Sequence, residues 1–205
     1  SQVNVNSTAR VVVEPGGSGV VAHVGLHALG CFGDRLGLAD SLSARVVPKG
    51  ERLPVHDRGK VLVQAMLMLA GGGEACSDIE YLRSQGALFG SVPSDTTLYR
   101  TLTGIDEATR DGLWSAMAEV RSKVWARAGV TTGAGRVILD IDASLHEIHS
   151  ENKEHAAPHF KGGYGFHPIY CTADATGEVL GVRLRSGNAG ANTITDHVAV
   201  LDQAI

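Results

Sequence analysis

The spacing of apolar residues changes about two-thirds of the way along the chain. Up to residue 128 they recur every three or four positions, and after residue 136 they alternate every two. The first period is that of an amphipathic helix and the second that of a strand. We therefore predict an α+β protein in which a helical region, residues 1–135, precedes a β-rich region, residues 136–205, with a small-residue linker at 131–135.

Capping residues predict where the helices begin. Asp57, Ser94 and Asp106 each stand just before a helical pattern, and Ser77 with Glu80 has the spacing of a capping box. Residues 85–93 are predicted to be a turn-rich linker. The predicted helices are residues 24–46 (two short helices interrupted at Gly30, Gly33 and Gly37), 59–69, 77–84, 95–102 and 106–128, after a short strand at 11–13.

The last third of the chain predicts three strands and a helix. Residues 136–145, 165–173 and 178–184 are rich in β-branched residues, and the Asp-Ala-Thr-Gly sequence at 174–177 is typical of a hairpin turn. Residues 186–192 form a predicted loop. The apolar spacing of residues 193–205 then favours an amphipathic helix.

Composition narrows the class of protein. With 43% hydrophobic residues the chain can bury a core, but its longest apolar run, Val61 to Ala70, is interrupted by Gln64 and is too short to span a bilayer. The chain has no basic-then-apolar leader, and its three cysteines form no C-x-x-C pair. These features predict a cytoplasmic protein with reduced thiols and no membrane partner.

The charges are distributed unevenly. Residues 1–135 hold 13 basic and 13 acidic residues, whereas residues 136–205 hold 5 and 9, together with six of the nine histidines. An acidic, histidine-rich region indicates carboxylate or metal chemistry. The same balance argues against a strongly basic surface for nucleic acid.

Two aspartates stand in the first predicted strand. Asp140 and Asp142 project from the same face, because side chains on a strand repeat every two residues. Carboxylate oxygens are ligands that Mg²⁺ and Mn²⁺ prefer, so the pair is a candidate metal site. A structural role, in which one aspartate bonds backbone amides at the end of the strand, is equally compatible with the pattern.

The histidines and the glycine-rich segment are weaker candidates for a functional site than the aspartate pair. His146 and His149 follow a strand directly and would face opposite sides, so we do not expect them to share an ion. His155 and His159 stand in a polar loop and are expected to be solvated. Lys161, followed by Gly162 and Gly163, could approach a phosphate, although the residues alone favour a glycine-eased turn into the next strand.

The helices at 77–84 and 94–102 are candidates for a helix-turn-helix. Nine residues separate them, more than the usual tight turn. Thr96, Thr97 and Arg100 would be exposed on the second helix and could reach phosphates or base edges. The alternative is that both helices only pack against the core.

Several segments together resemble the IS1380-type insertion-sequence transposases of the IS4-like DDE group. The resemblance rests on residues 54–60 (PVHDRGK), 93–97 (PSDTT), 139–145 (LDIDASL), 156–168 (AAPHFKGGYGFHP), 186–193 (SGNAGANT) and the Asp196–His197 pair. These segments extend over nearly the whole chain.

The resemblance implies a helical DNA-binding region followed by a ribonuclease-H-like catalytic domain. Such enzymes cut insertion-sequence ends in double-stranded DNA and join the freed 3′-hydroxyl to a target. Two Mg²⁺ or Mn²⁺ ions, about 3.5–4 Å apart, assist the displacement. The first catalytic aspartate corresponds to Asp142, with Asp140 as its neighbour or substitute. DNA contacts are expected at Thr96, Thr97, Arg100 and Lys161, in a nucleoid-associated bacterial protein whose homo-oligomeric state stays open.

The chain departs from the family pattern in one respect. It contains only the first part of such a domain, three strands and a helix, and the second aspartate and the later glutamate have no counterpart. The resemblance therefore implies the N-terminal portion of a transposase, with little or no catalysis by this chain alone. The alternatives are a non-catalytic DNA-binding or regulatory remnant and a small metal-dependent hydrolase.

Overall fold

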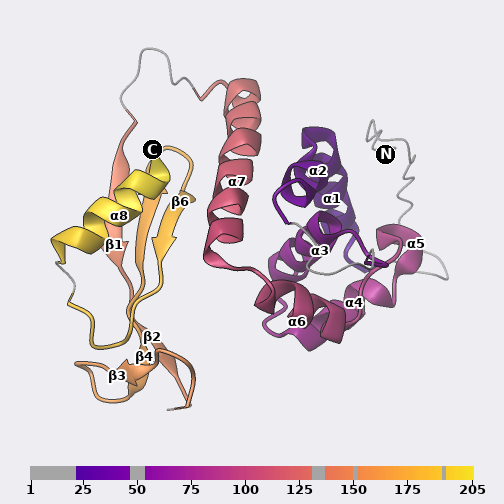
Figure 1. The fold of residues 1–205 in the computed structure, drawn as a ribbon. Helices are drawn as coiled ribbons and strands as arrows, with labels where there is room; N and C mark the ends of the chain where they lie inside the picture. The colour runs from indigo at the N-terminus through magenta and orange to yellow at the C-terminus, as the bar shows by residue number, and fades with distance from the viewer. Residues whose placement is uncertain (1–21, 47–53, 131–136, 150–151, 191–192) are drawn as a thin grey trace. The chain divides into compact units, whose positions relative to one another are not determined.

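The computed structural model describes residues 22–46, 54–130, 137–149, 152–190 and 193–205. It has the predicted α+β composition, with helices followed by small antiparallel sheets (Figure 1). The chain forms two compact units, residues 1–129 and 130–205, and each is described by itself. The predicted strand at 11–13 and the predicted linker at 131–135 lie outside the described residues.

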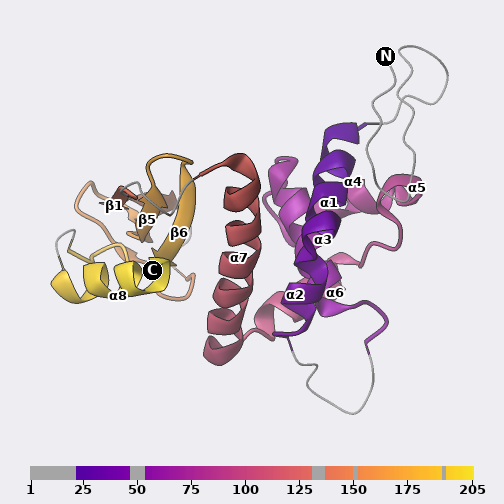
Figure 2. The ribbon, with the colours of Figure 1, turned by 90° about the horizontal axis from the view of Figure 1, so that it is seen from above.

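The first unit is helical (Figure 2). Its elements are α1 (Val24–Leu36), α2 (Leu38–Ser43), α3 (Arg58–Ala70), the 3₁₀ helix η1 (Cys76–Ile79), α4 (Glu80–Arg83), α5 (Gly86–Phe89), α6 (Asp95–Thr103) and α7 (Glu107–Ala128). None of the helices in the described part of the chain is long and apolar enough to cross a membrane.

The predicted helix starts are confirmed at three positions. The side chains of Asp57, Ser94 and Asp106 each accept a hydrogen bond from a backbone N–H three residues further on, at the N-termini of α3, α6 and α7. Of the glycines in residues 24–46, Gly37 ends α1, with a left-handed φ of 71°. Gly33 lies inside the helix, where it is buried.

Two predictions in the region of α4 are wrong. Ser77 does not cap a helix, because it lies inside η1, which begins at Cys76. The carboxylate of Asp78 instead accepts hydrogen bonds from the backbone N–H groups of Glu74 and Ala75, at 2.8 and 2.9 Å. The predicted linker at 85–93 contains a helical turn, α5.

The core of the helical unit lies on both sides of α3. One buried cluster joins α3 to η1, α4 and α6, and a second joins it to α2 and α7. Gly59 lies at the crossing of α2 and α3, where a Cβ atom would overlap the carbonyl oxygen of Ala39. The glycine therefore lets the two helices approach closely. On α7, Val120 of the predicted inward stripe is buried, whereas Leu113 and Met117 are half-buried against the second cluster.

In the described residues of the second unit there are six strands and a helix rather than the predicted three strands and a helix. They are β1 (Leu139–Ala143), β2 (His146–Ile148), β3 (Ala157–Pro158), β4 (Tyr164–Phe166), β5 (Ile169–Ala173), β6 (Glu178–Arg183) and α8 (Ile194–Ala204). They form two antiparallel three-stranded sheets, with strand orders β1-β5-β6 and β2-β4-β3. The predicted hairpin at 174–177 connects β5 to β6.

The predicted strand at 165–173 is divided at His167 and Pro168. Phe166 pairs with His146 in the small sheet, whereas Ile169 pairs with Ala143 in the larger one. Pro168 has no N–H to donate to a strand ladder, and its carbonyl oxygen accepts a bond from Ser144 at the corner between β1 and β2. The chain therefore passes from one sheet to the other at this proline.

Helix α8 covers one face of the β1-β5-β6 sheet (Figures 1 and 2). Val200 packs against Ile169 and Cys171, all of them at most 1% exposed. A Cβ atom on Gly181 would come within 2.7 Å of the Val200 carbonyl oxygen, so this glycine allows α8 to lie close to β6. Of the apolar residues in this predicted amphipathic helix, Ile194 and Val198 are exposed, whereas Val200 is buried.

Candidate functional site

The acidic pair lies on the face of β1 opposite α8. Asp140 and Asp142 are exposed, and the residues between and around them, Leu139 and Ile141, pack toward the core under α8. The alternation of exposed and half-buried side chains along β1 places both carboxylates on one face, as predicted. The carboxylate of Asp142 accepts a hydrogen bond from the backbone N–H of Ala143 at 2.8 Å.

A tyrosine and a histidine accompany this pair. In the β1–β5 register, Asp142 is opposite Tyr170 and Asp140 is opposite Thr172, so all four side chains share a face. The Tyr170 hydroxyl lies 3.0 Å from Nε2 of His146, and their rings meet edge-on. Sequence reasoning missed this contact, because the strand division at Pro168 determines which residue His146 meets.

The donor chemistry of the acidic face suits a hard divalent cation only in part. Carboxylate oxygens are suitable ligands for Mg²⁺. Among the described residues, however, no three His, Cys, Asp or Glu side chains are grouped so that they could hold a metal ion. The described residues thus offer ligands of the right kind without a complete coordination sphere.

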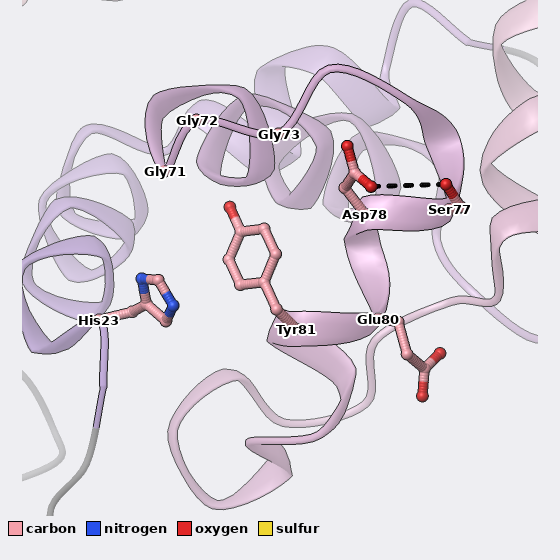
Figure 3. Close-up of a pocket in the computed structure, with 8 residues that line it drawn as sticks. All are labelled: His23, Gly71, Gly72, Gly73, Ser77, Asp78, Glu80 and Tyr81. Atoms are coloured by element: carbon pink, nitrogen blue, oxygen red, sulfur yellow. Dashed lines mark hydrogen bonds between the residues drawn. The ribbon is translucent and has the colours of Figure 1, made fainter.

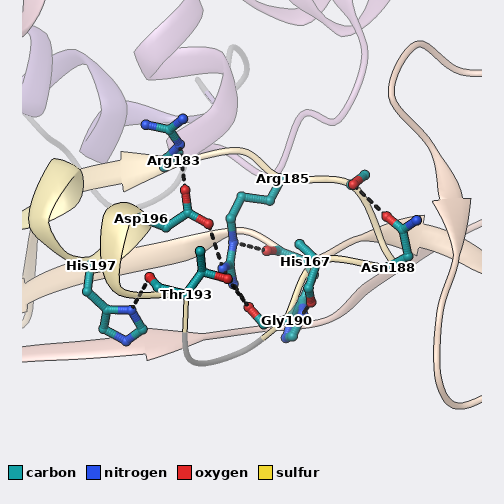
Figure 4. Close-up of polar contacts among 10 residues, drawn as sticks. His167, Arg183, Arg185, Asn188, Gly190, Thr193, Asp196 and His197 are labelled. Atoms are coloured by element: carbon teal, nitrogen blue, oxygen red, sulfur yellow. Dashed lines mark hydrogen bonds and ion pairs between the residues drawn. The ribbon is translucent and has the colours of Figure 1, made fainter.

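A buried arginine joins the loop after β6 to α8 (Figure 4). The Arg185 side chain is 5% exposed, and its Nη1 lies 3.1 Å from Oδ2 of Asp196 in the first turn of α8. Its Nε and Nη1 also donate to the carbonyl oxygens of His167 and Gly190, at 2.9 and 2.8 Å. The exposed Arg183 meets Oδ1 of the same aspartate at 3.1 Å.

The segment from Ser186 to Gly190 is held by the same network. His167 is buried, and its Nδ1 lies 2.7 Å from the carbonyl oxygen of Ala189. A Cβ atom on Gly187 would overlap the backbone of Ala157 in β3. Much of the Ser-Gly-Asn-Ala-Gly segment is therefore committed to joining the two sheets and α8.

Lys161 lies in the turn between β3 and β4, where it is exposed. The prediction that His159 is solvated is wrong, whereas His155 is exposed as expected. The His159 side chain is fully buried, its Nδ1 accepts a bond from the Lys161 N–H at 3.2 Å, and its Nε2 lies 3.8 Å from Oε1 of Glu147. The glycine-rich turn folds over this ring, which removes it from water.

The predicted DNA-contacting residues on α6 differ in accessibility. Thr96 and Arg100 are exposed, and the Arg100 guanidinium has no hydrogen-bond or ion-pair partner in the described part of the chain. Thr97 is half-buried, and its hydroxyl lies 3.1 Å from that of Ser94, so the prediction of an exposed Thr97 is wrong. The first threonine and the arginine remain available to a partner.

A shallow pocket of about 440 Å³ lies beside α4 (Figure 3), and its lining includes none of Thr96, Thr97 and Arg100. Its Tyr81 hydroxyl donates to the carbonyl oxygen of Met68 at 2.6 Å, and the Tyr81 ring stacks near His23. The backbone N–H groups of Glu74 and Ala75 hold the pKa of Asp78 below its usual value. The side chains of Tyr81 and Asp78 in this pocket therefore bond to the backbone of the same unit, where they stabilise the chain around the start of α4.

Comparison with known families identifies the chain. The model of the family described as Transposase DDE domain group 1 matches residues 3–205, which is nearly the whole chain. Comparisons with curated proteins and with solved structures give no match. Enzymes of this family generally use a divalent metal ion, although the described residues show no complete metal site. The match extends over both structural units, and the chain belongs to the DDE transposase family.

Proposed function

We propose that this chain is a DNA-binding part of an IS1380-type DDE transposase and carries its first catalytic aspartate. The observation that supports this most directly is the exposed carboxylate pair on β1, within a chain that matches the transposase family from end to end. The three-stranded antiparallel meander with a covering helix is compatible with the first part of a ribonuclease-H-like domain.

Asp142 is the residue we assign to the metal. In the complete enzyme its carboxylate would hold a divalent cation, and that cation would supply charge stabilisation at the reacting phosphate. Asp140, on the same face two residues away, would add negative charge that attracts the ion. Thr172 and Tyr170, which both carry hydroxyl groups, are opposite the pair on β5.

The test of this assignment is metal binding by the purified chain. Mn²⁺ titration followed by electron paramagnetic resonance should show weak binding that Asp142→Asn reduces several-fold, with Asp174→Asn, an exposed aspartate in the β5–β6 turn, as the matched control. Equal binding by both variants would remove Asp142 from the site.

DNA binding is assigned to the helical unit through α6, and to Lys161 in the second unit. Arg100 is exposed and unpaired among the described residues, so it is free to contact a phosphate, with Thr96 beside it. Binding to insertion-sequence ends should weaken as salt rises, since each phosphate contact releases counterions. Arg100→Ala should lower the affinity, and Arg83→Ala, an exposed arginine paired with Glu80, is the control.

A second candidate function is a non-catalytic DNA-binding or regulatory role. It is favoured by the lack of any three-ligand cluster in the parts of the chain that the structure describes. The same observation weighs against a self-sufficient metal-dependent hydrolase. Incubation of supercoiled plasmid with the chain and Mn²⁺ decides between them: binding without nicking supports the regulatory role, and nicking that Asp142→Asn abolishes supports catalysis.

A further inference from the structure

The turn between β3 and β4 presents a large aromatic side chain to solvent. Phe160 is 76% exposed, although a phenylalanine is normally buried because its ring is apolar. Among the described residues, two ring or charge contacts reach it: His167, with ring centroids 6.4 Å apart, and the ammonium of Lys161, 5.7 Å from the ring centroid. Most of the ring surface is therefore open.

The backbone around this ring is held by short-range bonds. The His159 N–H donates to the carbonyl oxygen of Gly163 at 3.0 Å, and the Gly162 N–H donates to that of His159 at 3.1 Å. The two glycines have positive φ values of 81° and 135°, which favour residues without a Cβ atom. Because His159 is buried beneath the turn, the turn has an anchor in the protein interior.

An open aromatic ring beside a cation is a combination that suits single-stranded or unstacked nucleic acid. A nucleobase can stack on the ring, and the ammonium can approach the neighbouring phosphate. Anchoring the turn before binding reduces the entropy lost when the base is bound. Of the exposed side chains near Phe160 in the sequence, Pro158 is uncharged and Lys161 is positive, whereas the exposed Glu147 lies beneath the turn, 3.8 Å from Nε2 of His159.

We propose that the turn formed by residues 159–163 is a base-stacking site, in which Phe160 stacks on an unpaired DNA base and Lys161 contacts the adjacent phosphate. This inference rests on the proposed function, since it requires that the chain binds DNA. It adds a preference for unstacked bases, such as those at a frayed or cut end, that the contacts assigned to α6 do not supply.

The test compares single-stranded and fully paired DNA of arbitrary sequence. Stacking tolerates any base, so a fluorescein-labelled 20-mer, free or annealed to its complement, is a sufficient probe. Phe160→Ala should weaken binding of the single strand about 5-fold or more and leave duplex binding within about 2-fold. Phe160→Trp should retain the affinity, because it preserves an aromatic face.

Two controls separate stacking from general effects. Ile194→Ala removes a 79%-exposed apolar side chain elsewhere in the same unit and should leave both affinities unchanged. Lys161→Gln should reduce the dependence of binding on salt by about one phosphate contact. Circular dichroism of each variant checks that the fold is retained.

Three outcomes would overturn the inference. If Phe160→Ala lowers the affinities for single-stranded and duplex DNA equally, or lowers neither, the turn does not stack on bases. In that case, duplex binding by the wild-type chain would still support the proposed function. If the wild-type chain binds neither DNA, the inference and the proposed function both fail. If Phe160→Ala abolishes self-association in sedimentation and leaves DNA binding intact, the ring belongs to a protein interface instead.

Discussion

Replacing Asp196 by alanine tests whether the buried network is what holds α8 on its sheet. The substitution leaves the Arg185 guanidinium buried without its carboxylate partner, and removing one partner of a buried ion pair costs about 3–5 kcal/mol. Here Arg185 keeps two carbonyl acceptors, and Asp196 is 15% exposed. We therefore expect about 2–3 kcal/mol of destabilisation.

Arg183→Ala is the matched control for this substitution. It removes a contact of the same 3.1 Å length to the same aspartate, but the Arg183 side chain is 54% exposed. An exposed ion pair contributes about 0–1 kcal/mol, because water solvates both charges when it breaks. Asp196→Ala removes the contacts to both arginines, whereas Arg183→Ala removes only the exposed contact, so the difference between the two variants measures the buried contact to Arg185.

Hydrogen exchange measures the effect within the second unit. Amides of β5 and β6 should exchange about 30- to 150-fold faster in Asp196→Ala, the equivalent of 2–3 kcal/mol, and less than about 6-fold faster in Arg183→Ala. Both tryptophans, Trp114 and Trp125, belong to α7, so tryptophan fluorescence reports on the helical unit. The melting temperature measured by this fluorescence should be the same in both variants and the wild type. Equal acceleration in the two variants would refute the argument from burial.

Three further predictions concern single contacts. Gly181→Ala should destabilise the second unit by about 1–3 kcal/mol in thermal melts, because the added methyl would meet the Val200 carbonyl oxygen at 2.7 Å; an unchanged melting temperature would mean that α8 shifts freely. Asp78→Asn should destabilise the helical unit at pH 7 but progressively less toward pH 2. The pKa of Asp78 is lower in the folded protein than its unfolded value of 3.8, so the ionised carboxylate stabilises the fold fully above pH 3.8. This stabilisation is lost as the pH falls through the folded pKa. A difference in stability between the two proteins that does not change with pH would contradict this prediction. Tyr170→Phe should shift the ring signals of His146 in nuclear magnetic resonance spectra while costing about 0.5–1.5 kcal/mol, and unshifted signals would show that their hydrogen bond does not form in solution.

Local signals predicted the helical unit well because its elements are specified by nearby residues. Asp57 and Asp106 cap α3 and α7 through contacts three residues away, and Gly37 ends α1 through its own backbone. The prediction that Ser77 caps a helix was wrong because Ser77 and Asp78 both have side chains that can accept backbone hydrogen bonds at this turn. Asp78 wins this competition, since its carboxylate can accept two backbone N–H groups at once.

The second unit was predicted less completely because its arrangement depends on contacts distant in sequence. The period of two placed Asp140 and Asp142 on one face. Pro168 is a local signal for a break within residues 165–173, but nothing near it in the sequence shows that the two parts join different sheets. The same division brings His146 to Tyr170, and the glycine-rich turn at residues 161–163 folds over His159. His155 and His159 were both expected to be solvated because they stand in a polar loop, and the fold closes over His159 alone.

The rate at which the Cys171 thiol reacts with a labelling reagent can report on the movement of α8. Cys171 is completely buried beneath the helix. Burial, together with the nearby charge of Asp140, raises the pKa of the thiol. The folded unit therefore protects this thiol from alkylation. A maleimide reagent can reach this sulfur only when the helix lifts. The rate at which the label appears on Cys171, measured separately from that on Cys31 and the half-buried Cys76, therefore reports how often the sheet is uncovered under native conditions and without denaturant.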